Sequence, residues 1–187
     1  MISVTLQYMK EMSFLSIEGK NLCKYIDSKL INESVQSIGR KISQDYGEEQ
    51  ISILCVLNGA FMFAADLMRS ITSPCEISFI RLSSYEGTET TGKVRMVNDI
   101  PDSLSNRHVL IVEDIVDTGI TMNFLINEVK KLQPKSIKVA TMFDKPSRRK
   151  CHVHVDYIGL TIEDKFIVGY GLDYNGLFRN LPDIYTK

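Results

Sequence analysis

The chain has 187 residues and a net charge of −1, with 44% hydrophobic and 24% charged residues. This length favours a single domain with a full hydrophobic core. The near-neutral charge argues against a nucleic-acid-binding surface, which usually carries a basic excess. The sequence contains no apolar run long enough to cross a membrane and no secretory signal, so we expect a cytoplasmic protein.

The first half of the chain is expected to alternate helices with apolar strands. Apolar residues recur at helical spacing over residues 31–42, and Gly47 lies just past the end of this helix. A continuous apolar run over residues 51–57 predicts a strand. It is followed by a helix over residues 60–68 and a second strand over residues 76–82.

The second half continues this alternation after a polar, glycine-containing loop over residues 83–93, which we expect to be mobile. A helix over residues 122–132 ends before Pro134. Further strands are expected at residues 94–97, 108–112, 136–143, 155–160 and 166–168. Apolar strands separated by helices imply an α/β fold with a mostly parallel sheet covered on both faces. In such sheets, ligands bind at the carboxyl ends of the strands.

Two adjacent carboxylates, Glu113 and Asp114, follow the strand at residues 108–112 and lie at this edge of the sheet. Their mutual repulsion is offset if cations or hydroxyl donors face them, so the pair suits Mg²⁺ or the vicinal hydroxyls of a sugar. The alternative is a pair of solvated loop acids. A phosphoacceptor receiver domain, whose first strand also ends in paired acids, is disfavoured because only 73 residues follow the pair.

The turn from Asp117 to Thr121 opens directly into the next helix. Its backbone amides, its threonine hydroxyls and the positive end of the helix dipole make a site for a phosphate monoester. Gly119 allows the backbone to approach such a group closely. The simpler interpretation is that a threonine only caps the helix. An acidic patch followed by a phosphate site matches the polar features of a ribose 5-phosphate.

Residues 109–121 resemble the diphosphosugar-binding signature of the type I phosphoribosyltransferases. Other stretches resemble the hypoxanthine(-guanine) branch of that family and occur in its order: Leu57-Asn58-Gly59, Ser83-Ser84-Tyr85, Asp144-Lys145-Pro146, and Phe166 to Asn175 with Arg179 beyond. The resemblance implies a central, mostly parallel sheet flanked by helices, in a single domain over residues 1–187. The core would span about residues 31–160. The N-terminal segment and residues 161–187 would form a small hood.

The resemblance also implies a reaction. Enzymes of this branch serve purine salvage. They transfer the 5-phosphoribosyl group from 5-phospho-α-D-ribose 1-diphosphate (phosphoribosyl diphosphate) to N9 of hypoxanthine or guanine, giving IMP or GMP and diphosphate, and they require Mg²⁺. They usually form homodimers or homotetramers. Three alternatives stay open: an enzyme preferring guanine or xanthine, an RNA-binding regulator that keeps the fold, and a small-molecule sensor without catalysis. The near-neutral charge disfavours the RNA-binding alternative.

By this resemblance, Asp117 would act as the general acid or base at purine N7. Glu113 and Asp114 would hold the ribose hydroxyls with Mg²⁺ nearby, and Asp173 would contact Mg²⁺ through water. The 5′-phosphate would bind to a loop made of Asp117, Thr118, Gly119, Ile120 and Thr121.

The purine would bind to four residues of the later strands and loops. Lys145 would donate to the purine O6, because an ammonium group has donors and no acceptor. Phe166 would stack on the base, although a lone phenylalanine also suits a core. The main chain of Ile167 and the region of Asp173 would contact the purine edge.

The diphosphate would bind to backbone amides of Leu57, Asn58 and Gly59 and to Arg179, whose guanidinium fits phosphate. The sequence departs from the family pattern here, because Asn58 stands where lysine is common. Ile120 likewise replaces a lysine found in some relatives. Ser84 and Tyr85 would belong to a loop that closes over the reacting centre and excludes water.

Two further groups of residues are noted without a role in this scheme. His152 and His154 alternate on a predicted strand and share a face, but no third metal ligand is evident. Arg148, Arg149 and Lys150 are interpreted as a solvated basic run.

Overall fold

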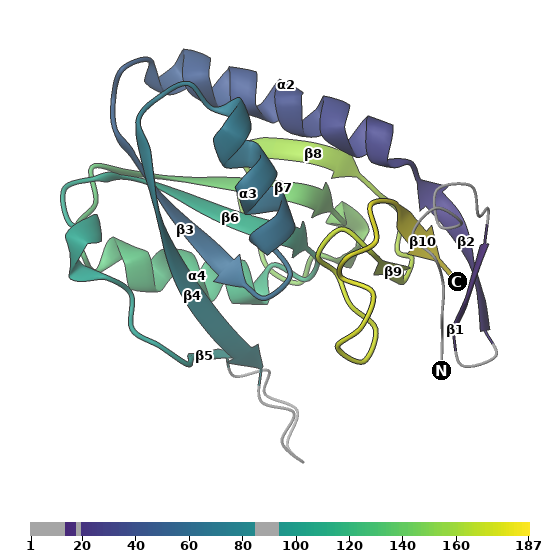
Figure 1. Cartoon of the computed structure of the whole chain (residues 1–187). Helices are drawn as coiled ribbons and strands as arrows, with labels where there is room; N and C mark the ends of the chain where they lie inside the picture. Colours follow the sequence, from purple (N-terminus) through teal and green to yellow (C-terminus); the bar gives the residue numbers. More distant parts are fainter. Residues whose placement is uncertain (1–13, 18–19, 85–93) are drawn as a thin grey trace.

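The computed structural model describes residues 14–17, 20–84 and 94–187, which form two β-sheets and three α-helices (Figure 1). The larger sheet has six strands in the order β5-β4-β3-β6-β7-β8. Neighbouring strands are parallel except β4 and β5, which pair antiparallel. These strands are β3 (Ile51–Leu57), β4 (Cys75–Ser84), β5 (Val94–Met96), β6 (His108–Val116), β7 (Ser136–Asp144) and β8 (Tyr157–Thr161).

Helices cover both faces of this sheet. α2 (Ser28–Tyr46) and α3 (Phe61–Ser70) pack on one face, and α4 (Ile120–Lys130) packs on the other. The buried residues of α2 lie one turn apart along a single stripe, as its apolar spacing predicts. No helix in the described part of the chain is long and apolar enough to cross a membrane.

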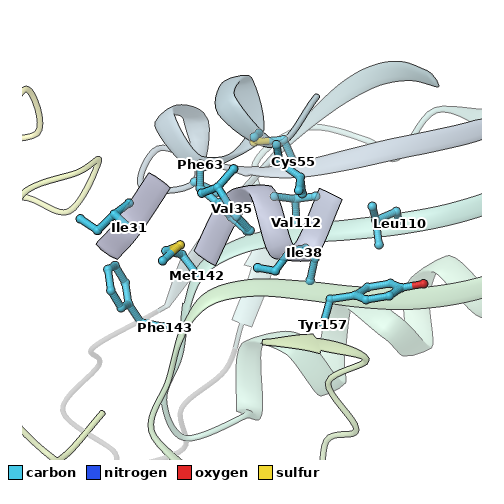
Figure 2. Packing of buried hydrophobic residues seen from close by; sticks show 14 of the residues in the cluster. Ile31, Val35, Ile38, Cys55, Phe63, Leu110, Val112, Met142, Phe143 and Tyr157 are labelled. Atoms are coloured by element: carbon cyan, nitrogen blue, oxygen red, sulfur yellow. The ribbon is translucent and has the colours of Figure 1, made fainter. Parts of the chain in front are cut away.

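Alternate residues of the central strands point to opposite faces of the sheet, and both faces are buried. On β3, Ile53 and Cys55 pack against α2 and α3, whereas Leu54 and Val56 pack against the α4 side. Figure 2 shows the core between the sheet and helices α2 and α3. This two-sided burial explains why β3 is a continuous apolar run rather than an alternating one.

Both ends of the chain contribute to the second, smaller sheet, in which neighbouring strands pair antiparallel. Its order is β1 (Phe14–Ile17), β2 (Lys20–Ile26), β10 (Ile184–Thr186) and β9 (Ile167–Val168). The strands β2, β9 and β10 lie beyond the end of α2 that follows β2 (Figure 1).

Asp183 links this small sheet to helix α2. Its buried carboxylate accepts hydrogen bonds from the backbone amide of Ser28 at 2.8 Å and from Lys24 Nζ at 2.7 Å. Burial opposes ionisation, but these two donors outweigh it and lower the pKa of Asp183 below its ordinary value. The small sheet is therefore fixed to the first turn of α2 by a charged group.

The predicted α/β architecture is confirmed: a mostly parallel sheet, helices on both faces and a small sheet built from the chain ends. Three details differ. β6 continues to Val116, because Ile115 and Val116 still pair with β7. α4 ends at Lys130, before Pro134 is reached. His152 and His154 do not lie on a strand, since β8 begins only at Tyr157.

Candidate active site

Glu113 and Asp114 lie inside β6, near its carboxyl end, and not in a loop after it. Each is only 9% exposed, so the alternative of solvated acids is wrong. Glu113 Oε1 accepts a hydrogen bond from Asp114 N at 3.3 Å, and Asp114 Oδ1 accepts one from Ile115 N at 2.8 Å. Burial, reinforced by the neighbouring Asp114, raises the pKa of Glu113 well above its usual range. Burial also raises the pKa of Asp114, although the charge of Arg179 opposes this.

The loop after β6 leads into the N-terminus of α4. Gly119 is the N-cap residue, with φ of 81°, and its carbonyl accepts the hydrogen bond of Asn123 N at 2.8 Å. Of the amides before Asn123, that of Ile120 donates to Thr118 Oγ1 at 3.4 Å, and those of Thr121 and Met122 have no intrahelical acceptor, because a helix leaves its first amides unpaired. Thr121 and Met122 lie next to a cavity of about 150 Å³. The cavity is lined by Glu113, Ile115, Val116, Asp117, Thr118, Gly119, Thr121 and Met122.

Asp117 lies just after the carboxyl end of β6, with its side chain 38% exposed. Its carboxylate accepts a hydrogen bond from Arg148 Nε at 3.1 Å. Arg148 also contacts Asp164 at 3.3 Å. In this arrangement the Asp117 carboxylate has an ion-pair partner and still faces solvent.

The interpretation of residues 148–150 as a solvated run is wrong for Arg149. Arg148 and Lys150 are exposed, but the Arg149 side chain is half-buried. Its guanidinium donates to the carbonyl oxygen of Val116 at 2.6 Å, to the carbonyl of Asp117 and to the carboxylate of Asp144. The local sequence does not distinguish Arg148 from Arg149, so their different environments could not be predicted.

Lys145 follows β7 directly and is 6% exposed, which excludes a solvated lysine. One of its donors is directed to the carbonyl oxygen of Lys165 at 2.5 Å. The next residue, Phe166, is 48% exposed and is not a core residue. Its ring packs edge-on against Tyr174 with centroids 5.9 Å apart. Ile167 then begins β9. Lys145 is thus tied to the segment that presents Phe166 and Ile167.

The loop after β3 contacts two other parts of the chain through Gly59. The Leu57–Asn58 peptide that precedes it is cis. A Cβ atom at Gly59 would overlap the carboxylate of Asp114, and a Cβ atom at Gly171 would overlap the carbonyl oxygen of Gly59. Gly171 has φ of 97°, a region that favours glycine. Sequence reasoning missed Gly171; the paired glycines at 169 and 171 were the available signal.

Arg179 contacts the same segment at Gly171 and Asp173. It donates to the carbonyl oxygen of Gly171 at 2.6 Å and pairs with Asp173 at 2.7 Å. Asp173 also accepts a hydrogen bond from Gly176 N at 2.7 Å. In the described ranges, no three His, Cys, Asp or Glu side chains converge on one point. Asp173 and the Glu113–Asp114 pair therefore do not form a joint set of direct metal ligands.

The loop expected to close over the site lies mostly outside the described residues. Ser84 is the last residue of β4 and pairs with Val94 of β5. Tyr85 lies outside the described residues. The remaining residues predicted for the site are described: they lie on β6, in the loop after it, at the start of α4, directly after β7, and in the segments after β3 and before β10.

Comparison with known proteins gives one consistent result. A family model described as phosphoribosyl transferase domain matches residues 24–175. A hypoxanthine-guanine phosphoribosyltransferase of Staphylococcus epidermidis is 41% identical over 162 residues, which are 84% of this chain and 90% of the relative. The corresponding protein of Staphylococcus aureus is 36% identical over 179 residues, covering 95% and 93%.

A solved structure gives the same answer. The crystal structure of a hypoxanthine-guanine phosphoribosyltransferase from Bacillus anthracis, with a HEPES molecule in its active site, superposes with a TM-score of 0.84 at 42% identity. The match covers 88% of this chain and 97% of that one. The chain therefore belongs to the phosphoribosyl transferase domain family.

Proposed function

We propose that this protein is a purine-salvage enzyme. It transfers the 5-phosphoribosyl group from phosphoribosyl diphosphate to N9 of hypoxanthine and guanine, giving IMP or GMP and diphosphate. The observation that carries this proposal is the cavity at the end of β6, which is lined by the buried carboxylate Glu113 and by the first turn of α4 at Thr121 and Met122. The two relatives, which this chain matches over most of their length, are named for this activity.

In this proposal the ribose 5-phosphate occupies that cavity. The 5′-phosphate accepts hydrogen bonds from the loop of Asp117, Thr118, Gly119, Ile120 and Thr121 and gains from the helix dipole. The two ribose hydroxyls donate to Glu113 and Asp114. These carboxylates are buried side by side, so hydroxyl donors would relieve their repulsion.

The purine lies between the ends of β6 and β7. Asp117 takes or returns the proton at N7, and its half-exposed carboxylate is open to a ligand. The Lys145 ammonium donates one hydrogen bond to the carbonyl oxygen of Lys165 and has further N–H groups available for the purine O6. Phe166 offers an exposed ring face for stacking, and the main chain of Ile167 and the region of Asp173 complete the base site.

The diphosphate binds across the loop of Leu57, Asn58 and Gly59. The half-buried guanidinium of Arg179 lies near this loop, because it donates to the carbonyl oxygen of Gly171, which packs against Gly59. It therefore supplies positive charge where Asn58, an exposed neutral residue, does not. Ser84 and Tyr85 close over the bound substrates.

Mg²⁺ fits the donor set found here. Glu113 and Asp114 offer oxygen ligands, which magnesium prefers, and Asp173 would act through water because it lies in a separate contact. Bound Mg²⁺ would neutralise charge on the diphosphate leaving group. We further propose that the protein forms a homodimer or homotetramer. We also propose a cytoplasmic location, since its four cysteines are all free thiols.

The decisive experiment measures nucleotide formation from phosphoribosyl diphosphate with hypoxanthine, guanine, xanthine and adenine in parallel. We expect turnover with hypoxanthine and guanine and none with adenine, whose 6-amino donors mispair with Lys145. Preference for guanine or xanthine over hypoxanthine would support the sister activity, and no turnover would refute the proposal. Lys145→Ala should weaken the rejection of adenine; unchanged rejection would remove Lys145 from the base site.

A further inference from the structure

The end of β6 and the loop after it present three consecutive carbonyl groups, of Val116, Asp117 and Thr118, to the segment after β7. The Val116 carbonyl accepts from Lys145 N at 3.0 Å, and the Thr118 carbonyl accepts from Lys150 N at 2.9 Å. The ends of β6 and β7 that carry these two segments lie side by side (Figure 1). The segment after β7 is therefore hydrogen-bonded along one side of the loop.

The Asp117 carbonyl is the middle one of the three, and its donor is a side chain. Arg149 Nη1 donates to it and also to the Val116 carbonyl, at 2.6 Å. The other end of the same guanidinium is fixed by the buried carboxylate of Asp144. The stem of Arg149 runs past Gly119, where an added Cβ atom would meet Arg149 Cδ at 3.4 Å.

Carbonyls held on one side of the loop direct its amides to the other side. In a trans peptide the C=O and N–H groups point in opposite directions. The carbonyls of Val116, Asp117 and Thr118 share peptide planes with the amides of Asp117, Thr118 and Gly119. Asp117, Thr118 and Gly119 line the cavity.

We propose that Arg149 is a positioning residue, which sets the Asp117 peptide so that the loop's amides and the Asp117 carboxylate meet the phosphorylated ribose. This inference rests on the function proposed above. Arg149 touches no substrate in this scheme. It acts through the loop, and Asp144 holds it in place. Arg148 differs, because it contacts the Asp117 carboxylate at the surface.

The test compares Arg149→Gln and Arg149→Lys with Arg107→Gln as the matched control. Arg107 is an exposed arginine that donates to Gln50 at 2.9 Å and lies before β6, at the opposite end of the strand. Arg149→Lys keeps the charge and the stem, but an ammonium group lacks the planar fork that joins three acceptors. It therefore provides a folded variant if Arg149→Gln does not fold.

Two quantities are measured besides thermal stability: the dissociation constant of ribose 5-phosphate by calorimetry, and kcat and KM for phosphoribosyl diphosphate. We expect both Arg149 variants to bind ribose 5-phosphate at least about tenfold more weakly and to lose about 100-fold in kcat/KM, because a displacement near 1 Å has that effect. Arg107→Gln should match the wild type in both.

A merely structural role would lower the amount of active protein, and hence the apparent kcat, without changing KM or the dissociation constant of the folded fraction. The inference would be overturned if Arg149→Lys kept the wild-type KM and ribose 5-phosphate affinity, or if it kept the wild-type kcat/KM. The binding measurement needs no turnover. It therefore decides the role of Arg149 even if the wild type converts no purine, which would refute only the proposed function.

Discussion

The contact between Gly171 and Gly59 gives a prediction that separates backbone strain from displacement of the site. Replacing Gly171 by alanine places a Cβ atom on a residue with φ of 97°, where side chains are rarely found. The same atom would overlap the carbonyl oxygen of Gly59. The first effect costs about 1–3 kcal/mol of stability. The second forces the loop of Leu57 to Gly59 to move.

Gly47→Ala is the matched control, because it has the first effect without the second. Gly47 ends α2 with φ of 55°, and an added Cβ atom meets nothing within 4 Å. Both variants should lose stability, equivalent to roughly 2–4 °C in Tm for each kcal/mol, and Gly171→Ala should lose more because it also carries the overlap. Gly171→Ala alone should also move the proposed diphosphate loop by about 1 Å, which lowers kcat/KM about 100-fold.

The assay is kcat/KM for phosphoribosyl diphosphate, measured together with thermal unfolding. Gly47→Ala should keep the wild-type kcat/KM despite its lower Tm. If Gly171→Ala keeps it as well, the loop after β3 tolerates displacement and does not position the diphosphate. If Gly47→Ala loses as much activity as Gly171→Ala, the effect is one of stability and the reasoning is refuted.

Three further predictions concern charged groups. Asp117→Asn should lower kcat about 100- to 10,000-fold while changing the affinity for phosphoribosyl diphosphate little; wild-type turnover would remove Asp117 from the chemistry. Glu113→Gln should raise the Tm of the ligand-free protein by roughly 2–4 °C, because the raised pKa of Glu113 means that this buried carboxyl destabilises the fold at neutral pH, and should lower activity; a lower Tm would show that Glu113 stabilises the ligand-free fold. Asp183→Asn should cost about 2 kcal/mol at neutral pH. Since the pKa of Asp183 is lowered, its contribution is present above about pH 4 and lost as the pH falls further. Urea unfolding at several pH values should show the difference from the wild type shrinking in acid, and a constant difference would refute this assignment.

The main strands and the turn that leads into α4 could be predicted because each depends on neighbouring residues in sequence. The apolar run at 51–57 is β3 to the residue, since both faces of this strand are buried. The loop around Gly119 needs a positive φ and a following helix, and both are local features. The pair Glu113 and Asp114 could be identified for the same reason, but the sequence placed it after the strand, whereas it lies inside β6.

Features that depend on distant partners could not be predicted. His152 and His154 alternate as strand residues do, but Asp156 ends the pairing at this point. Its side chain accepts from Val139 N at 2.8 Å, and its amide donates to the Val139 carbonyl at 3.0 Å. Gly171 is required by a carbonyl of Gly59, more than a hundred residues earlier. No local pattern reports such a contact.

The buried acid pair and Asp183 illustrate opposite uses of a carboxylate. Asp183 is held by Ser28 and Lys24 in the folded chain, so its charge stabilises the fold without any ligand. Glu113 and Asp114 have backbone amides but no cation at hydrogen-bond distance within the described residues. Burial raises the pKa of both groups, so their ionised forms oppose folding unless hydroxyl donors or a cation face them. A ligand that supplies these groups binds the folded state alone and stabilises it by mass action. In the proposed function the phosphorylated sugar is such a ligand, so relief of the cost that these two carboxylates impose on the ligand-free fold would contribute to its affinity.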